Sequence, residues 1–98
     1  MPAYLVVIRY GPVKDEAAFA EYQRKTRANP PPVALEPLVL YGDVHALEGE
    51  APDAIVMLRF ASVAEAKRWY EDPAYEDARA SRLKAGMYQA FIVGGLDA

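Results

Sequence analysis

Three polar residues interrupt stretches that are otherwise almost wholly apolar, and they are the residues best suited to holding an anion. Arg9, Arg59 and Gln89 each lie in a different apolar run. Two like charges placed together in an apolar setting are unfavourable unless a carboxylate or an anionic ligand pairs with them. One interpretation is therefore a small pocket for a carboxylate or enolate-like ligand.

A second interpretation of the two arginines needs no ligand. They would pair with carboxylates of another copy of the chain, for which Glu36 and Glu48 are candidates, and so stabilise a dimer. Arginine suits such contacts because its planar guanidinium can bind a carboxylate through two hydrogen bonds. The sequence leaves both interpretations open.

His45 is the only histidine, and histidine is the residue type most used for proton transfer. It would act as a general base or a haem ligand, or it would lie on the surface after a predicted turn. No cluster of His, Asp or Glu has the spacing of metal ligands, so no metal site is expected. The sequence also lacks a glycine-rich phosphate loop and a G-x-S-x-G motif. We therefore expect neither nucleotide binding nor nucleophilic hydrolysis, and no cofactor.

Three further candidate ligand-binding residues lie around a predicted break between two helices. Trp69 and Tyr75 are either core residues packed on a sheet or part of the lining of the pocket. Arg82 would close over the mouth of that pocket, form a salt bridge with Glu76, Asp77 or Asp72, or bond to backbone carbonyls at Asp72-Pro73.

The composition excludes several classes of function. The net charge is −3 and the basic residues are scattered, so nucleic acid is not an expected partner. The absence of cysteine excludes disulfides and thiolate chemistry and fits a cytoplasmic protein. The apolar run near the N-terminus is too short for a signal peptide or a membrane span. Residues 1–98 are expected to form one domain, and seven tyrosines with one tryptophan favour aromatic side chains at an interface or around a cavity.

The elements that must position these side chains begin with strands. Runs rich in apolar and β-branched residues, bounded by Gly and Pro, predict extended structure. The expected strands are residues 4–10, 35–41, 54–60 and 87–93. Gly42-Asp43 predicts a tight hairpin to a short partner strand at 44–48, because glycine suits the first central position of a type II′ turn. Pro37 cannot donate to a sheet ladder and so predicts an edge strand or a bulge.

Helices are expected at about 15–27, 62–71 and 73–85. Ser62 and Asp72 are the expected N-caps of the second and third helices. Asp72-Pro73 ends the second helix and begins the third, because proline lacks an N–H yet fits the first helical position. The order β-α-β-β-α-β, with its second helix broken, predicts an α+β fold. This is a ferredoxin-like antiparallel sheet with helices on one face.

Both faces of the predicted sheet are apolar. Helices would cover one face and leave on the other a patch too large for a soluble monomer. We therefore expect a homodimer that packs sheet against sheet as an α/β barrel. We also expect the first and third principal strands to be parallel neighbours. That arrangement would bring Arg9 and Arg59 to the same end of the uncovered face.

A pattern of aromatic, small and proline residues spans the predicted helix break. It consists of Phe60, Ser62, Ala66, Trp69, Tyr70, Pro73, Tyr75 and Arg82. Together with Tyr22 and Leu47-Glu48-Gly49, it resembles the DUF1330 family over nearly the whole chain. The resemblance implies the fold and the dimer of the dimeric α/β-barrel superfamily, which includes monooxygenases, haem-degrading enzymes, isomerases and proteins with no assigned activity. The family itself has no agreed biochemical function. Relatives tend to have a glycine-containing segment where this chain has three prolines at 30–32.

The sequence thus predicts a small dimeric protein that binds a small anionic or aromatic organic molecule, with any catalysis independent of a cofactor. Arg9 and Arg59 would stabilise negative charge, and His45 or a tyrosine would move a proton. The alternative is a non-enzymatic dimeric module whose interior is filled by side chains.

Overall fold

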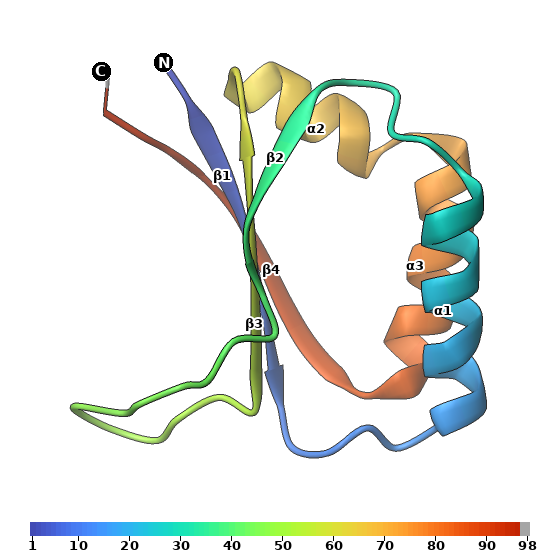
Figure 1. Ribbon diagram of the computed structural model, residues 1–98, viewed down its shortest axis with the longest axis vertical. Coiled ribbons are helices and arrows are strands. Elements are labelled where there is room, and N and C mark those ends of the chain that lie inside the picture. Colours follow the sequence, from blue (N-terminus) through green and yellow to red (C-terminus); the bar gives the residue numbers. More distant parts are fainter. Residues whose placement is uncertain (97–98) are drawn as a thin grey trace.

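A four-stranded antiparallel sheet carries three helices on one side (Figure 1), as the computed structural model, which describes residues 1–96, shows. The elements are β1 (Ala3–Tyr10), α1 (Glu16–Ala28), β2 (Leu35–Leu40), β3 (Ala54–Phe60), α2 (Val63–Tyr70), α3 (Pro73–Ala85) and β4 (Met87–Gly94). The strand order is β2-β3-β1-β4. The expected ferredoxin-like α+β fold, with its helices on one face, is confirmed.

The direction of the central strands differs from the prediction. β1 runs antiparallel to both β3 and β4, with Ala3 opposite Phe60 and Arg9 opposite Ala54. A helical crossover makes the strands on either side of it parallel, here β1 and β2. β3 returns from β2 through a loop without a helical crossover and pairs antiparallel with it, so β3 is antiparallel to β1 as well. The expectation that the first and third strands run parallel is therefore wrong.

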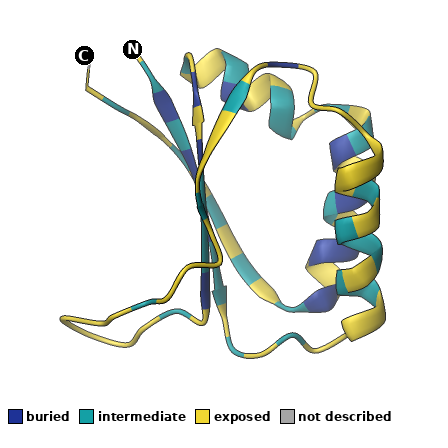
Figure 2. Cartoon of the chain, viewed as in Figure 1, coloured by how far each residue is buried: buried dark blue, intermediate teal, exposed yellow. Residues whose placement is uncertain are grey.

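The covered face of the sheet forms the core. Leu5, Val7, Leu58 and Phe60 project from β1 and β3 and pack with Ala66 of α2. Figure 2 shows buried positions along β1 and β3 and on the inner sides of α2 and α3. Among residues 1–96, no helix combines the length and the apolar character that a membrane crossing requires.

The Asp72-Pro73 break separates two helices that pack against different elements. α2 contacts β1, β3 and β4, whereas α3 packs along α1, and the ribbon bends sharply between the two helices (Figure 1). Both predicted caps are confirmed. The Ser62 side chain accepts from the backbone N–H of Glu65 at 3.1 Å, and Asp72 accepts from Ala74 at 3.2 Å with Pro73 in the first turn.

The hairpin expected after β2 is absent. Tyr41 adopts φ 59, which turns the chain away from the sheet, and residues 44–48 form no strand. Instead, residues 41–53 form a loop that projects from the side of the sheet opposite the helices (Figure 1). The prediction from Pro37 is confirmed, because β2 is an edge strand and its register shifts between Pro37 and Val39.

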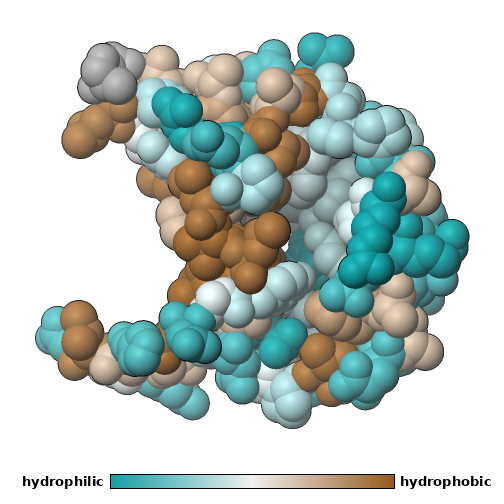
Figure 3. All heavy atoms as spheres, in the orientation of Figure 1, coloured by the Kyte–Doolittle hydropathy of each residue, from teal (hydrophilic) through white to brown (hydrophobic). Residues whose placement is uncertain are grey.

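The other face of the sheet is uncovered and apolar. Phe91, Val93 and Met87 of β4 are 51%, 52% and 62% exposed. The cross-strand register places them on the same face as Val6, Ile8, Tyr10, Ile55 and Met57. Figure 3 shows apolar atoms gathered in the hollow beside the sheet, bounded on one side by the 41–53 loop. We call this surface the uncovered face.

The N-cap of α2 gives a test of the fold. Replacing Ser62 with alanine removes the acceptor for the Glu65 N–H and should lower the free energy of unfolding by about 1 kcal/mol. Chemical denaturation measures this loss. Ser62→Asp is the matched control, because aspartate also caps, and it should stay within a few tenths of a kcal/mol of the parent. Equal stability of all three proteins would contradict the cap.

Candidate functional site

A small cavity lies between the covered face of the sheet and the pair α1 and α3. Its volume is about 30 Å³, and we call it the inner cavity. Two arginines, four tyrosines and one tryptophan dominate its wall. The lining residues are Val7, Arg9, Tyr22, Tyr41, Ala54, Val56, Trp69, Tyr75, Arg82 and Tyr88.

Arg82 is the unusual member of this lining. The residue is 2% exposed, and its Nε and Nη1 atoms are buried without a hydrogen-bond partner. Its guanidinium carbon lies 4.9 Å from the centre of the Tyr88 ring, a cation–π contact that supplies no acceptor oxygen. Within the described part of the chain, no carboxylate forms an ion pair with it. Buried arginines are normally paired, so this guanidinium lacks the counter-charge that its environment demands.

Arg9 approaches the same cavity from the end of β1. Its Nε donates to the carbonyl of Gly11 at 3.0 Å, which ties the side chain to the β1–α1 turn. Arg9 and Tyr88 both pass close to Gly86, where a Cβ would be in ordinary van der Waals contact, 3.5 Å from Cδ of Arg9 and 3.4 Å from the Tyr88 ring. The two arginines thus reach the cavity from different elements. Arg9 donates one hydrogen bond to a backbone carbonyl, whereas Nε and Nη1 of Arg82 have no acceptor.

The tyrosine hydroxyls add neutral hydrogen-bonding groups. The hydroxyls of Tyr22 and Tyr75 lie 3.3 Å apart, within hydrogen-bond distance, and the Tyr88 hydroxyl is buried with no partner. Burial raises the pKa of Tyr22 well above its usual range. Burial, followed by the nearby Tyr88, also raises the pKa of Tyr41. Both hydroxyls therefore stay protonated at neutral pH and can donate to an anion.

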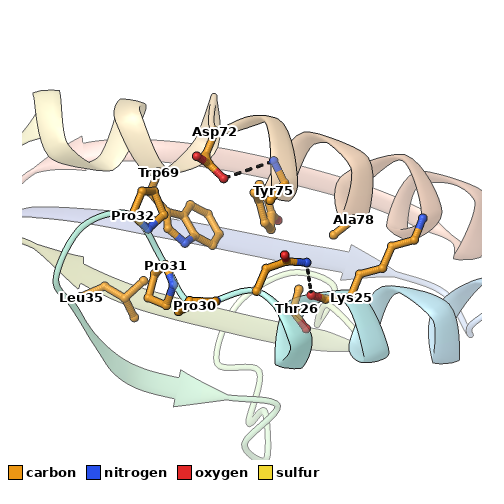
Figure 4. A pocket seen from close by; sticks show the side chains of 12 residues that line it. Lys25, Thr26, Pro30, Pro31, Pro32, Leu35, Trp69, Asp72, Tyr75 and Ala78 are labelled. Atoms are coloured by element: carbon orange, nitrogen blue, oxygen red, sulfur yellow. Dashed lines mark hydrogen bonds between the residues drawn. The ribbon is translucent and has the colours of Figure 1, made fainter.

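A second, larger cavity shares part of this wall. It has a volume of about 190 Å³, and we call it the outer cavity. Figure 4 shows the rings of Trp69 and Tyr75 projecting from α2 and α3 toward the proline segment between α1 and β2. The lining residues are Lys25, Thr26, Asn29, Pro30, Pro31, Pro32, Leu35, Trp69, Asp72, Ala74, Tyr75 and Ala78. Trp69 and Tyr75 line both cavities, with their ring centres 4.0 Å apart.

The structure brings together four of the residues singled out in the sequence. Arg9, Trp69, Tyr75 and Arg82 all line the inner cavity. Arg82 forms neither the expected salt bridge nor the expected bond to the helix break; instead Arg79 donates to the carbonyl of Tyr70 at 3.1 Å.

The other candidates lie elsewhere. Arg59 is opposite Tyr4, and Gln89 is opposite Ile8, so both belong to the uncovered face. The predicted juxtaposition of Arg9 and Arg59 is wrong, because the antiparallel register places them at opposite ends of β1 and β3 and on opposite faces of the sheet. His45 is exposed on the projecting 41–53 loop, away from both cavities.

Sequence reasoning missed Tyr22, Tyr41 and Tyr88 as lining residues. The alternation along β4 carried the signal for Tyr88, since it shares a face with Ala90 and Ile92. Tyr41 carried no such signal, because its position depends on the turn that ends β2. No group of three His, Cys, Asp or Glu side chains within residues 1–96 is arranged to hold a metal ion.

Comparison with known families settles the identity of the fold. The family model described as "Domain of unknown function (DUF1330)" matches residues 2–96. The chain belongs to the DUF1330 family. No curated protein matches this DUF1330 chain in sequence.

Several solved structures are similar to this DUF1330 protein. A protein of unknown function from Rhodopseudomonas palustris superposes with a TM-score of 0.62 and 18% identity, over 99% of this chain and 84% of that one. An ethyl tert-butyl ether d (ethd) family protein from Bacillus halodurans superposes with a TM-score of 0.63 and 13% identity, over 98% of this chain and 100% of that one. The cofactor-independent oxygenase SnoaB from Streptomyces nogalater superposes with a TM-score of 0.53 and 8% identity, over 99% of this chain and 94% of that one. At these identities the similarity establishes the shared fold alone.

The raised pKa of Tyr22 predicts an alkaline limit to stability. The folded state favours the neutral phenol of Tyr22. Its contribution to the free energy of unfolding is therefore complete below pH 10, near the ordinary tyrosine pKa, and declines at higher pH, where the phenol of the unfolded chain ionises. Tyr22→Phe should lower the free energy of unfolding by about 1 kcal/mol at pH 7, through the lost hydrogen bond, and should flatten the decline above about pH 10. Denaturation between pH 7 and 11.5 measures both. The control Tyr70→Phe, at a tyrosine of α2 that lines neither cavity, should leave the slope unchanged, and an unaltered slope in Tyr22→Phe would refute the assignment.

Proposed function

We propose that this DUF1330 protein binds a small organic anion, with the anionic group in its inner cavity. The buried guanidinium of Arg82, with two nitrogens that lack any acceptor, carries the proposal. A charged group removed from water and left unpaired is strongly unfavourable. An anion that enters the cavity supplies the missing acceptors, so its binding relieves a cost already present in the empty protein.

The rest of the lining supports an anion over other ligands. Both charged residues of the wall, Arg9 and Arg82, are positive, and no carboxylate lines the cavity. The buried Tyr88 hydroxyl lacks a partner and is free to donate. Aromatic rings form most of the remaining wall, which favours a planar or apolar body behind the anionic group.

The same lining favours binding over proton-transfer catalysis. No histidine, aspartate or glutamate lines the inner cavity. Burial raises the pKa of Tyr22, so its phenol ionises less readily than usual. A cofactor-independent reaction, like that named for SnoaB, is the second candidate. It is favoured by the guanidinium of Arg82, which would stabilise an enolate-like anion beside neutral phenols. Arg59 and His45 would take no direct part in either function, because both lie outside the inner cavity.

We also propose that the uncovered face packs against the same face of a second copy. Its exposed side chains include Phe91, Val93 and Met87, and the face is apolar across β1, β3 and β4 except at Arg59 and Gln89. A soluble monomer rarely leaves such a surface open. A symmetric partner covers it with the same residues, as in a sheet-to-sheet α/β barrel.

Arg82→Met tests the binding site. Loss of the guanidinium removes charge-assisted hydrogen bonds and should weaken the binding of butyrate and benzoate by about tenfold to a hundredfold. Titration calorimetry measures this, and so does the fluorescence of Trp69, the only tryptophan. Stability should be unchanged or higher, because the methionine replaces an unpaired buried charge.

Arg68→Met is the matched control, since Arg68 is exposed on α2 and outside both cavities. It should bind as the parent does. Parent-like binding by Arg82→Met would overturn the proposed site. A loss of several kcal/mol of stability in that variant would indicate that the arginine serves the fold instead.

Phe91→Glu tests the dimer. A carboxylate in the middle of β4, on the uncovered face, should shift the protein from dimer to monomer at micromolar concentration, as measured by light scattering. Leu83→Glu is the control: Leu83 is 57% exposed but lies on α3, and its substitution should leave the dimer intact. A parent protein that scatters as a monomer would refute the proposal.

A further inference from the structure

The inner cavity is too small for a whole organic ligand. A volume of about 30 Å³ exceeds the 10–15 Å³ that one water requires by about twofold, so it has room for a carboxylate head group and little more. The apolar remainder of any organic acid bound at Arg82 must therefore lie elsewhere.

The outer cavity offers adjacent space. It has about six times the volume, and it lies against the same two rings, Trp69 and Tyr75. Those rings meet at 4.0 Å with a tilt of 32°. The two cavities are thus neighbours across one aromatic pair, and a molecule that passes this pair occupies both.

The polar groups of the outer cavity are already engaged. Lys25 pairs with Asp77 at 3.2 Å, and Asn29 donates to the carbonyl of Lys25 at 2.9 Å. Asp72 caps α3, and the Thr26 hydroxyl donates to the carbonyl of Gln23 at 3.0 Å. What remains for a ligand is apolar surface from prolines, the indole and aliphatic side chains. The unsatisfied charge and the free apolar volume therefore lie on opposite sides of the ring pair.

We propose that the ligand is a monocarboxylic acid with an apolar tail, bound with its carboxylate at Arg82 in the inner cavity and its tail in the outer cavity. This assignment rests on the proposed function. A single carboxylate suffices, because Nε of Arg9 is held by Gly11 and the outer cavity presents no free charge to a second anionic group. The tail separates the rings of Trp69 and Tyr75 as it enters, so binding alters the environment of the indole.

A homologous series of acids tests the tail. Affinities of acetate, butyrate, hexanoate and octanoate for the whole protein are measured by calorimetry and by Trp69 fluorescence. Each methylene that enters the outer cavity should raise the affinity about fourfold. The gain should end when the tail reaches the mouth of the cavity.

Two variants locate the tail. Thr26→Phe fills the outer cavity from an exposed rim position, where a larger side chain is tolerated, and Ala74→Phe fills it from the first turn of α3. In both, the affinity for acetate should stay at the parent value, and the gain from butyrate to octanoate should fall at least tenfold. Circular dichroism confirms that each variant folds, and either variant alone is sufficient for the test.

The outcomes separate this inference from the proposed function. Acids that bind through Arg82 with no dependence on chain length would overturn the tail assignment and leave the anion site standing. A chain-length gain that survives in the folded Thr26→Phe and Ala74→Phe variants would do the same. Failure of every acid in the series to bind would overturn both proposals.

Discussion

The Asp72-Pro73 break is the constraint on which the rest of the structure depends. Proline cannot donate a backbone hydrogen bond within a helix, so α2 must end, and Asp72 caps the start of α3 with its own carboxylate. α2 can then lie on the sheet while α3 turns aside and packs along α1. A single unbroken helix could not do both. Long side chains occupy the space between α3 and the sheet, and the inner cavity lies among them.

The break also brings the aromatic residues together. Trp69 is among the last residues of α2 and Tyr75 lies in the first turn of α3, and the change of direction brings their rings to 4.0 Å. The hydroxyl of Tyr75 then reaches that of Tyr22 on α1. Ring stacking and this hydrogen bond tie the three helices to one another near the cavities. The same contacts form the wall between the inner and outer cavities, so the packing of the helices and the shape of the site have one origin.

Local sequence signals were sufficient for most of the fold and for part of the site. Strands and helices followed from periodicity, and Ser62 and Asp72 identified the helix starts, because caps depend on neighbours in the chain. Strand direction depends on the crossover and on the whole sheet. Treating β1 and β3 as parallel therefore paired Arg9 with Arg59, although the register puts them on opposite faces. The strand predicted at 44–48 is absent, because the positive φ of Tyr41 redirects the chain. The sequence could not show that Arg82 is buried without an acceptor, because that depends on which side chains pack around it in three dimensions.

An unpaired buried guanidinium is informative because the chain had simple ways to avoid it. α3 itself carries two acidic residues, Glu76 and Asp77, within two turns of Arg82, yet Asp77 pairs with Lys25 on α1. A carboxylate of the chain at the inner cavity would satisfy Arg82 and compete with any anion from outside. Under the proposed function, leaving that position to neutral tyrosines would keep Arg82 available to an incoming anion. The pattern of where the acids are placed therefore argues for a ligand more strongly than the arginine does alone.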